Sequence, residues 1–236
     1  PVELNRALES VQGRPKKTVK LKQQLLSKDT VRLLAEKTVS LVSNYSLILQ
    51  LALSTMILVL PFTSTARAIT PMPFLMFLFS AFWHELGHAT ALVYHGRRPG
   101  AIGVGVLMIF PVLWCDVTAT ALLDRNQKIR VDISGVIFQL SFASILHLLA
   151  IISGISEFET ASKLCLMAVG WNLIPFLRTD SYWLLCDLLK LDSLWKLPEN
   201  ATVSIRWFVY SYRFGKTAFL AIVLTSIIWQ IIQFLR

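Results

Sequence analysis

The chain has 236 residues, of which 55% are hydrophobic and only 16% charged, and its formal net charge is +9. Soluble domains have about a quarter of their residues charged, so this composition argues against a soluble globular protein and predicts a compact membrane domain. The three cysteines, Cys115, Cys165 and Cys186, are widely spaced and form no CxxC pair. This spacing argues against a disulfide framework, and we expect reduced thiols.

The N-terminal part of the chain is basic: nine of the 23 lysines and arginines lie before residue 38. We interpret residues 1–43 as a cytoplasmic or interfacial segment that follows the positive-inside rule, in preference to a site for acidic lipid or nucleic acid. We expect residues 1–28 to be mobile or to lie on the membrane surface, and Asp29 to cap an interfacial helix. Residues 44–236 then form the membrane domain.

Five apolar segments are expected to cross the membrane as helices, because most of them reach the ~20 residues that span the hydrocarbon core. They cover residues 45–62, 71–94, 131–152, 163–176 and 217–235. Basic residues gather on the N-terminal side of the first segment and after the second and fourth, which places the N-terminus in the cytoplasm. The predicted fold class is an all-α polytopic membrane protein with about five transmembrane helices.

Residues 100–123 are apolar but rich in glycine and β-branched side chains, and Pro111 lies in their middle. This pattern favours two short strands that meet near Phe110 over a straight transmembrane helix. Non-helical backbone at membrane depth is tolerated only where it is buried in protein or lines a cavity. We therefore expect a membrane-associated β-hairpin-like segment that lies against the functional site.

Residues 82–88, Phe-Trp-His-Glu-Leu-Gly-His, hold a His-Glu-x-x-His pattern inside the second apolar segment. Positions four apart share one helix face, so the imidazoles of His84 and His88 point at one spot. Neutral imidazoles suit Zn²⁺, and a catalytic zinc site uses three protein ligands. Glu85, at the edge of this face, can act as general base toward the attacking water. Ionisable groups in an apolar segment are costly, which favours a metal site over structural histidines.

The sequence offers five candidates for the third ligand, namely Asp180, Asp132, Asp116, His95 and His147. A continuing helix would place His95 about 10 Å beyond the second histidine of the motif, too far to share one metal. We expect His147 to be a hydrogen-bonded buried histidine, with contact to the outer side of the site as the alternative. Asp132 opens the third span and suits a cap or an ion pair, whereas Asp116 suits the lining of a cavity. Asp180 follows a break in the fourth span.

That break has the sequence Asn172-Leu173-Ile174-Pro175, an Asn-x-x-Pro motif that a known protein family also has. A His-Glu-x-x-His helix followed by an Asn-x-x-Pro motif and an aspartate resembles the site-2 protease family of intramembrane metalloproteases. The resemblance covers residues 71–190, although Ser181 stands where the family usually has glycine. The motif Pro-Phe-Leu-Arg-x-Asp-x-Tyr-Trp resembles one typical of the bacterial peptide zinc metalloprotease branch of that family. Members of this branch often accompany peptide maturation and export systems.

The resemblance implies a zinc metalloendopeptidase that cleaves a membrane-embedded or membrane-associated protein or peptide. Peptide maturation is one process in which such an enzyme would act. His84, His88 and Asp180 would hold Zn²⁺, and Glu85 would move the proton. Asn172 would hydrogen-bond the substrate backbone or the developing oxyanion, with a helix-ending cap as the alternative.

The glycine-rich stretch, with Gly103 and Gly105, would offer a strand edge to an unwound substrate. The expected setting is the bacterial cytoplasmic membrane, with the N-terminus and the active site toward the cytoplasm. The expected partners are the lipid bilayer and the substrate, with a homo-oligomer or an exporter as further candidates and no nucleic acid.

Two alternatives remain open. One is a non-proteolytic zinc-binding membrane component of a peptide export or immunity complex. The other is a membrane protease of the prenyl-protein type, which would take its third ligand from a glutamate on a later helix. The later glutamates are Glu157, Glu159 and Glu199, and none of them has a helical ligand context.

Overall fold

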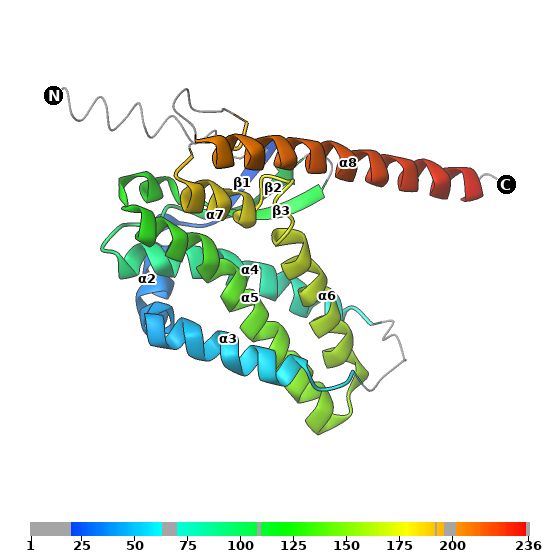
Figure 1. Ribbon diagram of the computed structural model, residues 1–236. Helices are drawn as coiled ribbons and strands as arrows, with labels where there is room; N and C mark the ends of the chain where they lie inside the picture. Colours follow the sequence, from blue (N-terminus) through cyan, green and yellow to red (C-terminus); the bar gives the residue numbers. More distant parts are fainter. Residues whose placement is uncertain (1–19, 63–69, 108–109, 192, 196–201, 235–236) are drawn as a thin grey trace.

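The computed structural model describes residues 20–62, 70–107, 110–191, 193–195 and 202–234. The chain is mostly helical, with one small antiparallel sheet (Figure 1). The expectation that residues 1–28 are mobile or lie on the membrane surface falls for residues 1–19 outside the described part of the chain, but Lys20–Leu26 form a strand of the sheet and are not a mobile segment. The division into residues 1–43 and 44–236 stays a prediction.

The elements follow one another along the chain in three groups. The first group is β1 (Lys20–Leu26), α2 (Lys28–Thr38), the 3-10 helix η1 (Val39–Val42) and α3 (Asn44–Leu58). The second is α4 (Met72–Tyr94), β2 (Ile102–Leu107), β3 (Phe110–Cys115) and the 3-10 helix η2 (Thr118–Leu122). The third is α5 (Arg125–Ser153), α6 (Ser156–Asn172), α7 (Asp180–Leu189) and α8 (Val203–Phe234).

The β2–β3 hairpin confirms the two strands expected in residues 100–123, but a third strand was not expected. β1 pairs antiparallel with β2, so that β2 is the central strand. Gly103 of β2 lies opposite Trp114 of β3, and a Cβ on Gly103 would meet that ring at 2.7 Å and the Gln23 carbonyl at 2.2 Å. Lys22 of β1 places its ammonium 4.9 Å from the centroid of the Trp114 ring. A glycine is therefore required where this ring crosses the central strand.

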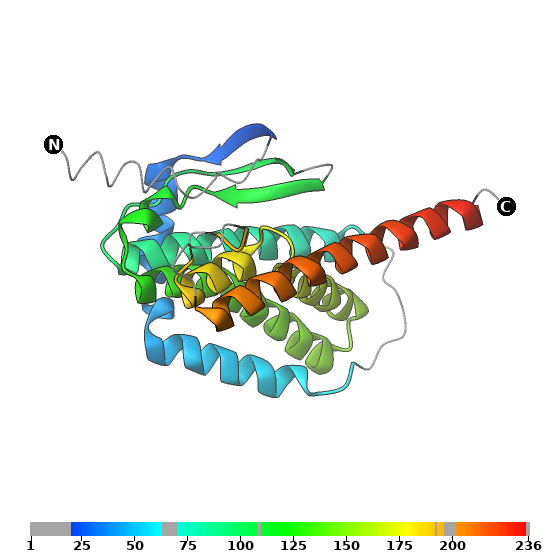
Figure 2. The same ribbon diagram turned by 45° about the horizontal axis from the view of Figure 1, so that its top comes forward.

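α4 and α5 form the central pair of the helical part and run antiparallel. Three contacts follow this order: His88 with Val131, Ser80 with Gln139, and Phe79 with Phe142. α3 packs on α5, α2 packs on α4, and α6 packs on both central helices. The sheet and α3 lie on opposite sides of this pair (Figure 2), and in both ribbon views the C-terminal half of α8 extends past the other helices.

The ends of α5 and α2 show how local sequence sets the helices. Asp124 caps α5 in a capping box with Gln127, each side chain accepting a hydrogen bond from the other residue's backbone N–H. α5 therefore begins before Asp132, which is neither a cap nor a first-turn residue. The helix expected after Asp29 is present, but its cap is Ser27, whose hydroxyl accepts a hydrogen bond from Thr30 N–H.

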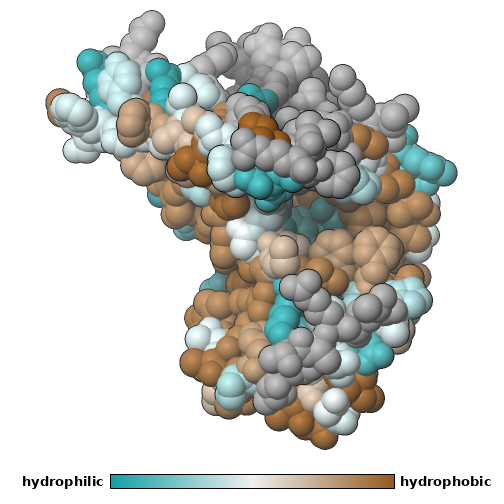
Figure 3. Space-filling view, turned by 90° about the vertical axis from the view of Figure 1, so that its right-hand side faces the viewer, coloured by the Kyte–Doolittle hydropathy of each residue, from teal (hydrophilic) through white to brown (hydrophobic). Residues whose placement is uncertain are grey.

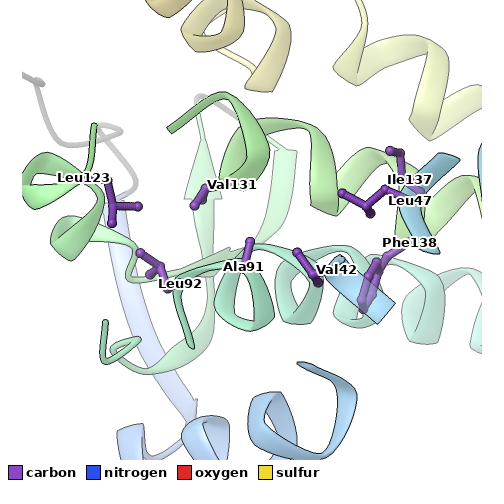
Figure 4. Packing of buried hydrophobic residues seen from close by; sticks show 8 residues of the cluster. All are labelled: Val42, Leu47, Ala91, Leu92, Leu123, Val131, Ile137 and Phe138. Carbon is purple, nitrogen blue, oxygen red and sulfur yellow. The ribbon is translucent and has the colours of Figure 1, made fainter. Parts of the chain in front are cut away.

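One hydrophobic cluster joins η1, α3, α4 and α5 (Figure 4). Its members are Val42, Leu47, Ala91, Leu92, Leu123, Val131, Ile137 and Phe138. The small residue at position 91 and the glycine at position 87 let the two central helices approach closely, because a Cβ at Gly87 would lie 2.7 Å from the Ser134 carbonyl. This tight packing fixes the register of α4 against α5, and with it the position of the His-Glu-x-x-His motif.

The expectation of five transmembrane helices is met only in part. Within the described ranges, α5 is the one helix that is both long and apolar enough to cross a membrane. The segment from α2 through η1, together with α3, also passes this test if the two are taken as one span, although they are bent by 77°. α3 has 15 residues and α6 has 17, so both are short for a span, and α4 carries the ionisable motif. A span in α8 stays a prediction.

Apolar side chains nevertheless cover much of the molecular surface. Figure 3 shows brown, hydrophobic residues over much of the lower part of the molecule, which in Figure 1 holds α3 and the C-terminal half of α5. Exposed members on these two helices include Ile48, Met56, Val59, Leu149 and Ile152. Contiguous exposed apolar surface marks a face that contacts something other than water.

Candidate metal centre

α4 carries both histidines of the motif on the face that packs against α5. The helix is unbroken from Met72 to Tyr94, so His84 and His88 are one turn apart on the same side. Their side chains are almost fully buried, with residue exposures of 5% and 6%. Their ring centroids are 4.8 Å apart and the two rings are nearly perpendicular. The edges of both imidazoles therefore converge on one buried point.

Asp180 reaches the same point from the N-terminus of α7. It is 7% exposed and stands at the first position of that helix, where the positive end of the helix dipole favours a carboxylate. The preceding loop is held at two carbonyls: the Thr179 hydroxyl donates to Ile174 O at 2.9 Å, and the Tyr212 hydroxyl of α8 donates to Pro175 O at 2.9 Å. The break between α6 and α7 thus has a defined conformation that aims the carboxylate.

Burial raises the pKa of the Tyr212 phenol, and the nearby Tyr182 phenol raises it further. A tyrosine hydroxyl is ordinarily protonated at neutral pH, and the raised pKa keeps it a donor to the Pro175 carbonyl at alkaline pH as well. The ring of Phe176 packs on the same tyrosine, with centroids 5.7 Å apart. Phe219 of α8 also packs on Phe176, with ring centroids 5.6 Å apart. α8 therefore supports the Asp180 loop by a hydrogen bond and by aromatic contacts.

The three side chains meet at metal-binding distances. The distance from His84 Nε2 to Asp180 Oδ2 is 2.9 Å, from His88 Nε2 to the same oxygen 3.5 Å, and between the two Nε2 atoms 3.1 Å. One ligand atom from each residue lies within 4.8 Å of the others. Bonds of about 2.0–2.2 Å in a tetrahedral zinc site correspond to ligand–ligand distances of about 3.3–3.6 Å. The donor set and its spacing are consistent with zinc.

The orientation of His88 adds a second sign of a metal ligand. Its Nδ1 lies 2.7 Å from the Val131 carbonyl of α5, and a carbonyl can only accept, so Nδ1 carries the proton. Nε2 is then the ring nitrogen that faces the other two ligands and would bind a metal. Metal-binding histidines usually donate their second ring nitrogen in this way, which fixes both tautomer and ring orientation. Val131 was not singled out from the sequence, because a backbone acceptor leaves no signature in it.

Glu85 is 7% exposed and lies one residue beyond His84 on α4. A helix turns by about 100° per residue, so this carboxylate lies at the side of the ligand cluster and outside it. Its predicted part as general base agrees with this placement but stays a prediction.

The other candidate ligands lie elsewhere. The Asp116 carboxylate accepts hydrogen bonds from the Thr118 N–H and hydroxyl, which closes the turn after β3. His147 donates from Nε2 to the Leu60 carbonyl at 3.1 Å, and its ring lies 4.1 Å from that of Phe62. It is thus a hydrogen-bonded buried histidine, as expected. His95 and Asp132 do not belong to the ligand group found in the described ranges.

The later glutamates are not ligands in the described ranges either. Glu159 is buried and pairs with Lys163 at 2.7 Å, and Glu157 accepts a hydrogen bond from the Ser156 hydroxyl. Glu199 lies outside the described part of the chain. These placements give no support to a prenyl-protein type of protease.

The candidate substrate-binding residues lie in two different parts of the structure. Asn172 is the last residue of α6 and is half-buried at the break, where its contact with substrate stays a prediction. Gly103 and Gly105 lie in the central strand, which pairs with β1 on one side and β3 on the other. The suggestion that their strand offers an open edge is therefore corrected: the outer edges of the described sheet belong to β1 and β3.

The chain is similar to a Bacillus subtilis (strain 168) protein named "Putative peptide zinc metalloprotease protein YydH". The two are 30% identical over 132 residues, which cover 52% of this chain and 50% of that protein. The chain thus spans about half the length of this relative. No protein-family model matches the chain, and no solved structure matches it significantly. The likeness supports a relationship to zinc metalloproteases, and the buried His–His–Asp group agrees with it.

Proposed function

We propose that this chain is an intramembrane zinc metalloprotease of the site-2 type, which hydrolyses a peptide bond in a membrane-embedded or membrane-associated protein or peptide. The observation that carries the proposal is the buried convergence of His84, His88 and Asp180, whose ligand atoms lie within 4.8 Å of one another. Two of them come from α4 and the third from the start of α7, far along the chain. The named relative and the intact Glu85 make hydrolysis the best-supported use of such a site.

The residues divide the chemistry between them. When bound, Zn²⁺ supplies Lewis acidity toward the attacking water and the scissile carbonyl. Glu85 takes the proton from that water and later gives it to the departing amine. Asn172, at the end of α6, donates from its side-chain amide to the substrate backbone or to the developing oxyanion. The burial of all three ligands excludes bulk water, which strengthens each of these electrostatic contacts.

An unwound substrate would be held by strand addition. A helical peptide hides its scissile carbonyl, whereas an extended one can pair with an open sheet edge. β3 packs against α4, the helix that carries the histidines, and its outer edge has no partner strand in the described sheet. We assign the docking edge to β3 in place of the central strand.

The membrane setting is part of the same proposal. The apolar surface of α3, α4 and α5 supports several membrane-inserted helices. The distribution of lysines and arginines in the sequence supports a cytoplasmic N-terminus and a site toward the cytoplasm. A second copy or an exporter are further proposed partners. Labelling of a cysteine introduced at position 126 tests the orientation: reaction from the outer side of the membrane would invert it.

The decisive experiment separates enzyme from scaffold. Glu85→Gln is nearly isosteric and is no ligand, so the purified variant should keep the metal and the fold. Loss of a general base costs about 10²–10⁴ in rate. Candidate membrane peptides would be co-expressed with wild type and with the variant, and cleavage followed by mass spectrometry.

An undiminished cleavage rate in Glu85→Gln would contradict the mechanism. If the variant fully supports the cellular phenotype and neither protein cleaves any candidate, the non-proteolytic zinc-binding component of an export or immunity complex is the better description.

A further inference from the structure

α5 approaches the metal centre at a residue that has no side chain. A Cβ built on Gly135 would lie 2.4 Å from His88 Nε2 and 2.6 Å from His88 Cε1. Val131, one turn earlier on the same face of α5, accepts the hydrogen bond from Nδ1 of the same ring. One end of the imidazole is thus held by a carbonyl and the other end fits against a bare Cα.

We propose that Gly135 is a positioning residue for the metal centre: its missing side chain leaves the space in which His88 holds its ligand nitrogen toward His84 and Asp180. This inference rests on the proposed metal site and adds a residue of a third helix to it. Gly135 touches no substrate or reacting atom, so its effect passes through His88 alone.

The short distances from position 135 to the His88 ring predict that an alanine there would displace the ring strongly. Non-bonded heavy atoms are at their best separation about 3.5–4.0 Å apart, so an alanine methyl would have to separate from Nε2 by about 1 Å more than the present space allows. Metal–ligand distances are conserved to about 0.2 Å. A movement of this size in the ring therefore exceeds the tolerance of the coordination several-fold.

We expect the extra methyl to displace the His88 ring before it separates the helices. The alternative is for α5 to move away from α4, which would open the cluster that contains Ala91, Leu92, Val131 and Phe138. The two backbones are already in close contact at the adjacent residues, where a Cβ on Gly87 would lie 2.7 Å from the Ser134 carbonyl and 3.0 Å from the Gly135 Cα. A rotation of one side chain disturbs less packing than a separation of two helices, because buried residues each make many contacts.

The test measures cobalt binding by the full chain purified in detergent. Tetrahedral Co²⁺ gives a visible absorption that reports the ligand geometry without any need for activity. Changes in residues that orient a metal ligand usually lower metal affinity about 10- to 100-fold. For Gly135→Ala we expect a loss of Co²⁺ affinity in this range and a shifted, weaker absorption.

Two matched variants separate ring displacement from general damage. Gly170→Ala is also a glycine-to-alanine change within a helix, but a Cβ there meets nothing within 4 Å, so its affinity and spectrum should equal the wild type. Phe138→Leu loosens the α4–α5 cluster without entering the space beside His88. It should lower the melting temperature and keep the Co²⁺ spectrum.

The inference is overturned if Gly135→Ala binds Co²⁺ with wild-type affinity and spectrum, whether or not it melts earlier. It is also overturned if Phe138→Leu, at an equal loss of melting temperature, loses the metal equally. If the wild-type chain itself binds no Co²⁺, the proposed metal site fails as well, and that result is distinct from the other two.

Discussion

The α4–α5 pair has two halves that share the same helices and differ in almost every other respect. In one half, the C-terminal part of α4 and the N-terminal part of α5 enclose His84, Glu85 and His88, all at 7% exposure or less. In the other half, Phe74 of α4 is 57% exposed and Ile152 of α5 is 73% exposed.

This difference shows that burial along α4 does not follow hydrophobicity alone. The most polar part of α4 lies inside the protein, while its most apolar part lies on the surface. Burying an ionisable group is costly unless it is paired or bound to a metal, so the polar half is expected to have a function. An exposed apolar half marks a face that contacts something other than water, which agrees with the proposed membrane setting.

Removal of the third ligand should have the largest effect on the polar half. Asp180→Ala deletes the carboxylate that lies 2.9 Å from His84 Nε2 and leaves two imidazoles, which is fewer than the three protein ligands of a catalytic zinc site. We expect the purified variant to lose most of its zinc in metal analysis and its activity with it. Asp116→Ala is the matched control, because that carboxylate only closes a turn. Zinc loss from the Asp116 variant alone would mean that the carboxylate assignment is wrong.

A pair of truncations compares the two halves directly. Phe138 is fully buried between α4 and α5, and Phe138→Ala should lower the free energy of unfolding by about 3–5 kcal/mol. Leu149, on the same helix but 40% exposed, should cost within about 0.5 kcal/mol when replaced by alanine. Unfolding in detergent, followed by tryptophan fluorescence, measures both. Equal losses would show that the apolar half is packed against something in the purified protein.

We expect the smallest effect from removing the hydrogen bond that holds the loop before Asp180. Tyr212→Phe removes only the hydroxyl that donates to the Pro175 carbonyl and keeps the ring that packs on Phe176. A net loss of about 0.5–1.5 kcal/mol is typical for one intramolecular hydrogen bond. We expect a modest fall in melting temperature and a several-fold weaker zinc affinity. Tyr210→Phe, on an exposed residue of the same helix, should change neither quantity.

Much of the candidate site could be predicted because its signals are local in the sequence. Helix geometry alone predicts that His84 and His88, four residues apart, share one face. An asparagine and a proline indicate the break that precedes Asp180. The β2–β3 hairpin was equally visible as glycine and β-branched residues around a proline. β1 was not, because its sequence Lys-Leu-Lys-Gln-Gln-Leu-Leu has no β-branched residue. Its strand conformation comes from pairing with β2.

The sequence by itself indicated which side chains could hold a metal, which could move a proton, and that they lie in an apolar chain. The tertiary structure decided how those groups are supported. Of the five candidate ligands it brought Asp180 beside the two histidines, it placed the Val131 carbonyl and the bare Cα of Gly135 against His88, and it made β2 a central strand. The physical reason is that ligand type is a property of single residues, whereas orientation depends on backbone groups from helices that only packing brings together.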